Sequence, residues 1–179
     1  MRKHIASTRS FGRNVTDIED LREAIATYVS WAAVKLRKQK SATCGLYIFI
    51  QTNKNQYRPQ QHEGVYRELP VATDSTPELI RYATEMLQDL YREGNIYKKA
   101  GVMFSRIVPR ESVQLNVFDT IDRTKFNRLM NVLDVVNMRD GQGMLKFAAT
   151  GTTQNWMMRS GMRSPQYTTK WGDILKIGK

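Results

Sequence analysis

The sequence has few of the residues that disulfides and metal sites need. Cys44 is the only cysteine, so no intrachain disulfide can form, and its apolar neighbours favour a core thiol. His4 and His62 have no second plausible ligand near them in the sequence, so we expect no metal site. No apolar run approaches the ~20 residues that span a bilayer, and the N-terminus has no apolar signal region. These absences favour a reduced, cytoplasmic protein that does not insert into a membrane.

Motifs for catalysis are missing as well. No glycine-rich loop precedes a Lys-Ser or Lys-Thr pair, and Gly141–Gly143 resembles a bare turn. The acids Asp17, Glu19 and Asp20 are better explained by the start of a helix than by a cation site. The converging carboxylates that two-metal phosphoryl transfer needs are not recognisable. We therefore expect no catalytic residue, no metal and no cofactor in this chain.

Positive charge, by contrast, is abundant. The 179 residues include 28 lysines and arginines against 17 acids, which gives a net charge of +11. Such a surplus suits a polyanionic partner, nucleic acid first and an anionic membrane second, although a merely basic soluble protein is the alternative. Cationic side chains beside backbone amides can hold phosphates without reading bases. Three basic clusters at predicted strand edges or loops fit this use: Arg9 with Arg13, Lys54 with Arg58, and Lys98 with Lys99.

Hydrophobic periodicity predicts an α+β fold. The element order is β-α-β-β-α-β, which implies a four-stranded antiparallel sheet with two helices on one face and the other face open to a partner. Gly12 is expected to end the first strand and Pro70 the third. The predicted strands are 3–11, 43–52, 65–72 and 100–108, and the predicted helices are 17–39 and 76–91.

The rest of the chain differs in composition and predicts a small C-terminal α/β extension. A short amphipathic helix is expected over 125–136 and a short strand over 144–148. From Thr150 on, the chain is polar and irregular. We accordingly divide the chain into residues 1–110, a linker over 111–122, and an extension over 123–179.

One apolar peptide, residues 114–119, interrupts the polar linker. It begins with a glutamine and then carries Leu115 and Phe118 three positions apart. An exposed peptide of this form can insert both apolar side chains into a pocket while the glutamine bonds to the rim. The alternative is a fifth strand, since Val113, Leu115 and Val117 alternate.

These residues together resemble a known family. Arg9–Gly12 followed by a helix, and Tyr97–Met103, are similar to the first and last strands of the little finger of Y-family DNA polymerases. Residues 114–119 resemble the sliding-clamp-binding peptide of the UmuC type within that family, the polymerase subunit of DNA polymerase V. The tail resembles the UmuC-type C-terminal extension at three places: Gly141–Gly143, Trp156 and Ser164–Trp171.

The resemblance implies roles for individual residues. The little finger clamps primer–template DNA through backbone contacts, and Val117 stands where leucine is commoner, so we expect weaker but not absent clamp docking. DNA contacts are expected from Arg9, Ser10, Gly12, Lys98, Lys99 and Gly101, and the basic clusters add Arg13, Lys54 and Arg58. Clamp contacts are expected from Gln114, Leu115, Val117 and Phe118.

The resemblance also implies further partners, a processed UmuD dimer and RecA, and a place near the nucleoid. Trp156, Tyr167 and Trp171 are suspected of contacting these partners, although they could equally anchor an irregular tail. A complete family member carries the Mg-binding carboxylates in a palm upstream. We therefore expect this chain to be a non-catalytic portion of an error-prone translesion polymerase acting in SOS mutagenesis and DNA repair.

Two other functions fit parts of the sequence. A free-standing regulator could occupy the clamp or the UmuD dimer through the same surfaces, and the sequence cannot separate it from a polymerase portion. An RNA-recognition module shares the element order. Its third strand would carry a basic-Gly-aromatic motif, which Val65–Leu69 lacks.

Overall fold

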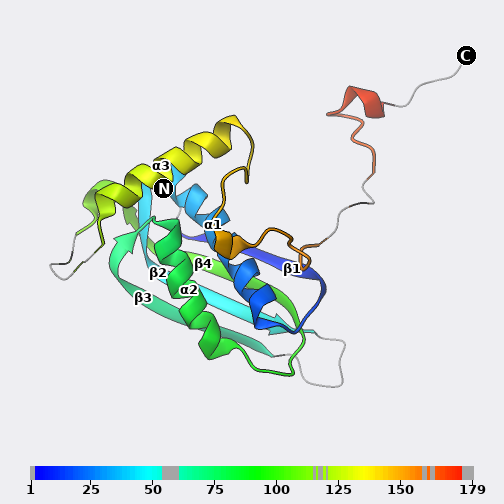
Figure 1. The fold of residues 1–179 in the computed structure, drawn as a ribbon, viewed down its shortest axis with the longest axis horizontal. Helices are drawn as coiled ribbons and strands as arrows, with labels where there is room; N and C mark the ends of the chain where they lie inside the picture. The colour runs from blue at the N-terminus through cyan, green and yellow to red at the C-terminus, as the bar shows by residue number, and fades with distance from the viewer. Residues whose placement is uncertain are drawn as a thin grey trace, which may run out of the picture.

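The computed structural model describes residues 3–53, 61–114, 116, 119, 121–158, 161 and 164–174. In this part of the chain, the elements follow the order β-α-β-β-α-β before a largely helical and irregular C-terminal stretch (Figure 1). The strands are β1 (Ile5–Val15), β2 (Ser41–Thr52), β3 (His62–Thr73) and β4 (Tyr97–Pro109). The helices are α1 (Ile18–Lys38), α2 (Thr76–Leu90) and α3 (Arg123–Arg139), with 3-10 turns η1 (Arg110–Ser112), η2 (Ala148–Thr150) and η3 (Trp171–Asp173).

The described strands form one antiparallel sheet. Their order is β1-β4-β2-β3, so β4 and β2 lie in the centre and β1 and β3 at the edges. Helices α1 and α2 cross the same face of the sheet (Figure 1). The predicted α+β fold, with two helices on one face of a four-stranded antiparallel sheet, is confirmed.

Alternate side chains along the strands build the core between sheet and helices. Ile48 of β2 lies opposite Val102 of β4, and both side chains are fully buried. The same buried cluster includes Leu21 of α1 and Leu87 of α2. Burying an aliphatic side chain of this size contributes about 1.5–3 kcal/mol, so this layer holds the helices to the sheet.

Helix α1 has the capping that its sequence predicts. The side chain of Asp17 accepts a hydrogen bond from the backbone N–H of Glu19 at 2.9 Å. Acids fill its first turn and bases, among them Lys35 and Lys38, its last turn, so both ends complement the helix dipole. None of the described helices, α1 included, is long and apolar enough to cross a bilayer.

Two strands run past the residues that the sequence predicts will end them. Strand β1 continues through Gly12 to Val15, because its register against β4 shifts after Ser10 and the extra residues form an irregularity. Strand β3 continues through Pro70 to Thr73. Proline is tolerated there because β3 is an edge strand and its pairing with β2 shifts around this position.

The C-terminal extension is less regular than predicted. Helix α3 exceeds the expected range at both ends, but residues 144–148 form no strand. The backbone of Leu145 is instead bonded by the side chain of Asn137, which donates to its carbonyl at 2.8 Å and accepts from its N–H at 2.9 Å. A strand-like ladder is therefore not needed to satisfy this backbone.

Helix α3 is held to the body by buried charge. The Arg37 guanidinium donates to both carboxylate oxygens of Asp134, at 2.6 and 2.8 Å, and to the backbone oxygen of Asp74 at 3.0 Å. In the middle of the helix, Met130 is 1% exposed. Bidentate pairs of this kind give orientation as well as energy, so they set the direction of α3 across the ends of α1 and α2.

A second attachment lies further along, at Trp156. Its ring is 1% exposed and meets Phe11 and Tyr28 edge-on, at centroid distances of 6.1 and 5.7 Å. The N–H of Gly12 donates to the Trp156 carbonyl oxygen at 2.9 Å. A Cβ at Gly12 would lie 2.6 Å from the carbonyl oxygen of Met157, so only glycine allows this close approach. The extension thus contributes to the core of the body.

Candidate nucleic-acid interface

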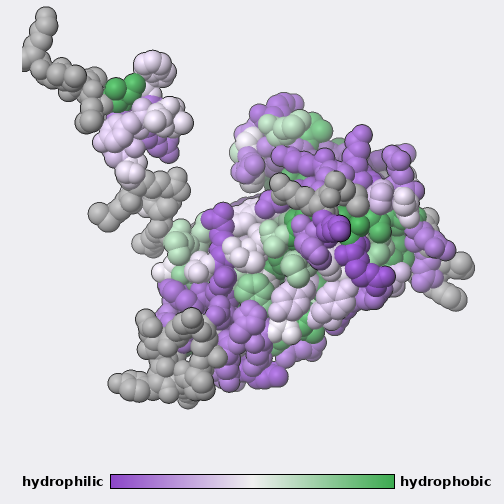
Figure 2. All heavy atoms as spheres, turned by 180° about the vertical axis from the view of Figure 1, so that it is seen from behind, coloured by the Kyte–Doolittle hydropathy of each residue, from purple (hydrophilic) through white to green (hydrophobic). Residues whose placement is uncertain are grey.

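The candidate site is the face of the sheet that α1 and α2 leave uncovered, which we call the open face. Figure 2 looks at the molecule from this side, and it shows pale and green side chains bordered by purple, hydrophilic ones. Strand pairing places these rows on it: Ser10–Lys99–Gln51–His62, Thr8–Gly101–Phe49–Gly64, Ala6–Met103–Tyr47–Tyr66 and Ser105–Gly45–Glu68.

The first of these rows includes Lys99, one of the two adjacent lysines of β4. Lys99 lies between Ser10 and Gln51, and its Nζ is 5.9 Å from the centroid of the Phe49 ring. Lys98 precedes it, where the register between β4 and β2 shifts. Both lysines are half-buried. Because lysine stems pack while their ammonium groups stay in water, both can meet an anion at this end of the sheet.

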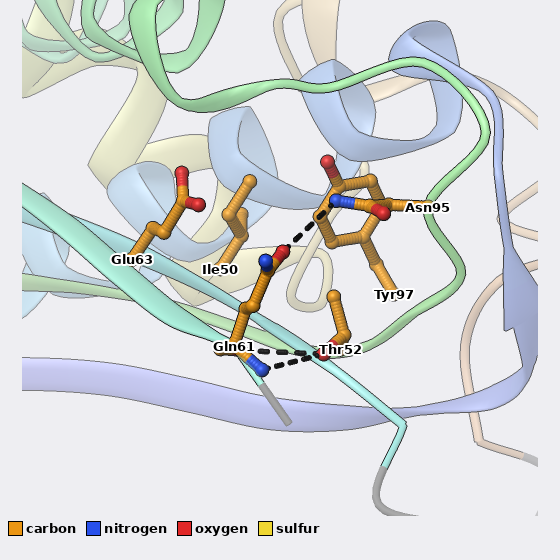
Figure 3. A pocket seen from close by; sticks show the side chains of 6 residues that line it. All are labelled: Ile50, Thr52, Gln61, Glu63, Asn95 and Tyr97. Atoms are coloured by element: carbon orange, nitrogen blue, oxygen red, sulfur yellow. Dashed lines mark hydrogen bonds between the residues drawn. The ribbon is translucent and has the colours of Figure 1, made fainter. Parts of the chain in front are cut away.

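Hydrogen bonds fix this end of the sheet (Figure 3). The backbone N–H of Gln61 donates to Thr52 Oγ1 at 2.9 Å, and the N–H of Thr52 donates to the Gln61 carbonyl at 3.0 Å. Asn95 Nδ2 donates to Gln61 Oε1 at 3.3 Å. These bonds join the end of β2, the start of β3 and the loop before β4. They fix the end of the sheet at which Lys98 and Lys99 lie.

Two predicted DNA-binding arginines of β1 are engaged elsewhere. Arg9 lies on the helix-covered side of the strand, and its guanidinium carbon is 5.0 Å from the centroid of the Trp31 ring in α1. Arg13 forms an ion pair with Asp20 at 2.5 Å. Both remain exposed. They therefore lie around the edge of β1, away from the open face.

The other predicted DNA contacts fall into three groups. Ser10 and Gly101 lie on the open face beside Lys99. The N–H of Gly12 already donates to a carbonyl of the extension and is not free for a phosphate. Lys54 and Arg58 lie outside the described residues. The structure thus brings together one part of the predicted set, and phosphate contact by any of its members stays a prediction.

The sequence analysis missed the aromatic residues of the open face. Tyr47, Phe49, His62 and Tyr66 gather there, at the centre and along β3. The sequence of β2 carried a signal for two of them. Its buried apolar residues alternate with Tyr47 and Phe49 and do not form one continuous buried run. In a strand, alternate residues point to opposite faces, so the alternation predicts one covered and one uncovered face.

The predicted clamp-binding peptide is partly described. Gln114 is exposed and lies outside any strand, as does Asn116, whereas Leu115, Val117 and Phe118 lie outside the described residues. Asp119 is fixed to the first turn of α3, because Arg123 donates to its carboxylate. This hydrogen bond holds the pKa of Asp119 below its ordinary value. The C-terminal end of the peptide is therefore tied to α3.

The suspected partner-binding aromatics of the tail differ in exposure. Trp156 is an anchor in the core, as the alternative interpretation predicted. Tyr167 is 47% exposed and Trp171 is 90% exposed. The structure therefore excludes Trp156 as part of a contact surface, while the roles of the other two stay predictions.

The open face offers groups for binding. Its side chains include rings, hydroxyls, an amide and a lysine, and the carboxylate of Glu68 is paired with Arg106. Among the residues with described positions, no three His, Cys, Asp or Glu side chains group into a metal site. The arrangement can hold planar and anionic groups.

Comparison with known proteins identifies the family. Residues 2–117 match the model of the impB/mucB/samB family C-terminal domain, and residues 127–177 match a domain of unknown function, DUF4113. The first match covers more than half of the chain. The chain therefore belongs to the impB/mucB/samB family.

Within that family, the chain is similar to the UmuC and ImpB proteins. Protein UmuC of Salmonella typhimurium is 35% identical over 178 residues, which are 98% of this chain and 42% of UmuC. Protein ImpB of Salmonella typhimurium is 34% identical over 175 residues, which are 97% of this chain and 41% of ImpB. The chain thus spans less than half the length of these relatives.

Solved structures show a looser similarity. Dbh DNA polymerase in an insertion ternary complex gives a TM-score of 0.49 at 9% identity, over 59% of this chain and 28% of that one. The little finger domain of PolIV, solved in complex with the β-clamp processivity factor, gives 0.41 at 13% identity, over 65% of this chain and 99% of that one.

Proposed function

We propose that this chain is the portion of a UmuC-type error-prone DNA polymerase that grips primer–template DNA and docks on the sliding clamp during translesion synthesis. The observation that carries the proposal is 35% identity to UmuC over nearly the whole chain. In this proposal the parent protein supplies Mg-dependent polymerisation and this chain supplies binding. A UmuD dimer and RecA are further proposed partners in the cytoplasm, near the nucleoid.

The cationic end of the open face supports the DNA part of the proposal. Lys99 is paired with Ser10 on the open face, and Lys98 precedes it in the chain. Ammonium and hydroxyl groups bond phosphate oxygens irrespective of base sequence. The net charge of +11 strengthens the general attraction to a polyanion. Binding of this kind is sequence-independent and weakens as salt rises.

The test is the affinity of the chain for a primer–template duplex, measured by fluorescence anisotropy over a range of salt concentrations. Log affinity falls linearly with log salt, and each lost phosphate contact makes this fall shallower by about one unit of slope. K99A should therefore reduce the steepness by that amount. The matched control is K38A, which removes the same charge from the exposed end of α1 on the other side of the sheet. Equal slopes for both variants would refute the assignment of Lys99.

The position of the linker peptide supports the clamp part of the proposal. Gln114 is exposed two residues after η1, and Asp119 is tied to Arg123 at the start of α3. A short peptide tied to a helix at one end has less conformational entropy to lose on docking than a free tail has. Its glutamine followed by apolar side chains has the form of an anchor for an apolar pocket.

Clamp docking can be tested with the double variant L115A/F118A and a bacterial sliding clamp, by surface plasmon resonance. The double variant should lose clamp binding while keeping its affinity for duplex DNA, because neither residue is among the predicted DNA contacts. Q166A, in the exposed tail, is the matched control and should leave clamp binding unchanged. Undiminished clamp affinity in the double variant would show that the peptide is not the docking element.

A further inference from the structure

Glycines on the open face lie beneath aromatic rings from neighbouring strands. A Cβ on Gly64 of β3 would lie 2.1 Å from the hydroxyl oxygen of Tyr47 of β2. A Cβ on Gly101 of β4 would lie 2.6 Å from a ring carbon of Phe49. Each ring therefore occupies the space in which a side chain of the next strand would stand. Glycine at these positions lets the rings lie down along the sheet.

The rings form a nearly continuous layer. Tyr66 extends over Gly45 in the same way, with its hydroxyl oxygen 2.6 Å from the place of a Cβ. The plane of Phe49 is 29° from that of Tyr47 at 6.2 Å and 37° from that of His62 at 5.0 Å. We call Tyr47, Phe49, His62 and Tyr66 the aromatic platform. It presents ring faces, more than ring edges, to whatever approaches the sheet.

The platform is poor in charge compared with its margin. Tyr66 is 48% exposed. Glu68, an acidic residue of the described open face, is neutralised by its ion pair with Arg106. Lys99 stands at one border, next to Phe49. Phosphates need cations, whereas ring faces attract planar groups through stacking. The chemistry therefore changes from anion binding at the lysine end to stacking in the middle.

We propose that the aromatic platform binds an unpaired DNA strand by stacking its bases, while Lys99 holds the adjacent phosphates. This inference rests on the proposed function and names a second form of DNA for the same face. Exposed rings with a cation beside them are the combination that single-strand binding uses, and such stacking tolerates any base. Paired bases in a duplex show only their edges, so they cannot use the ring faces.

The test compares two single strands with the same number of phosphates, one of thymidines and one of abasic sites. Binding of the 179-residue chain is measured by fluorescence anisotropy at fixed salt, and urea unfolding of each variant checks that it folds. The platform variant is F49L/Y66L, which keeps apolar bulk and removes two ring faces. The matched control is Y167L, which removes a ring of similar exposure, 47%, from the tail.

We expect the unmodified chain to bind the thymidine strand about fivefold or more tightly than the abasic strand, the effect of at least one stacked base. F49L/Y66L should remove this preference and leave abasic binding unchanged, K99A should weaken both strands alike, and Y167L should change neither. Equal binding of the two strands by the unmodified chain, or a preference that survives F49L/Y66L, would overturn the inference. So would failure to bind the thymidine strand at all. Duplex binding is measured separately, so loss of the base preference with duplex affinity intact leaves the proposed function standing.

Discussion

The two faces of the sheet are built from the same strands but serve different purposes. On the covered face, Ile48 and Val102 lie under α1 and α2 and are fully buried. On the open face, the residue after Ile48 is Phe49, which lies over Gly101, and the residue before Val102 is that same glycine. One face excludes water by contact with helices, and the other keeps its rings flat by leaving out side chains beneath them.

This difference separates what holds the fold together from what the fold presents. Side chains on the covered side share one continuous core, to which the extension adds Trp156. Side chains on the open face contact neighbouring strands but are not covered by α1 or α2. Substitutions on the covered side should therefore change mainly the free energy of unfolding, and removal of exposed side chains from the open face should change mainly binding.

The largest effect on stability should come from Trp156. W156A should lower the free energy of unfolding by about 3–5 kcal/mol, because it empties the space between Phe11 and Tyr28. Urea unfolding followed by circular dichroism measures this. W171A is the control, because that ring is 90% exposed and its loss should change stability by no more than about 0.5 kcal/mol. Similar losses in both variants would show that the extension does not share the core.

A smaller effect is expected beneath the platform. G101A should cost about 1–3 kcal/mol, because the new methyl group would meet the Thr8 methyl and the Phe49 ring, at 2.4 and 2.6 Å before relaxation. The control is G172A, since nothing lies within 4 Å of a Cβ there. Urea unfolding compares the two, and a fully neutral G101A would mean that the ring does not rest on this glycine.

The sequence predicts the fold because each element carries its own signal. The cap at Asp17, the helical stripe of α1 and the aliphatic positions of β2 all act locally, so the order of elements and the layering follow from them. Prediction from the sequence fails where a contact with a distant segment determines the local structure. Gly12 has the appearance of a strand end, yet a carbonyl of residue 156 accepts its N–H and the strand runs on.

The candidate site was predictable only in part for the same reason. Lys99 and Ser10 could be placed together once the strands were paired, because pairing fixes which residues are opposite. The platform depends on Gly64 and Tyr47, which lie on neighbouring strands and meet only through the exact register of β3 against β2. Local patterns do not specify a register, so this juxtaposition could not be inferred from them.

The smallest effect contrasts two tyrosines, one on each side of the sheet. The hydroxyl of Tyr28 is buried and has no hydrogen-bond partner among the described residues, whereas Tyr66 is 48% exposed. A buried hydroxyl without a partner carries a desolvation cost, so Y28F should be neutral or stabilise the protein by up to about 1 kcal/mol. Y66F should change the free energy of unfolding by less than about 0.5 kcal/mol.

The same pair differs in its response to alkaline pH. Burial raises the pKa of Tyr28, and the nearby Arg9 opposes this only in part. Above about pH 10, where an exposed tyrosine ionises, the unfolded chain loses this proton while the folded chain keeps it. The folded state then binds more protons, so the contribution of Tyr28 to stability falls as pH rises through that range. Urea unfolding at neutral and alkaline pH should therefore show a shallower loss of stability in Y28F than in the unmodified chain, with Y66F following the latter. Identical pH dependence in all three proteins would mean that water reaches the Tyr28 hydroxyl, and that the covered face is less dry than its packing implies.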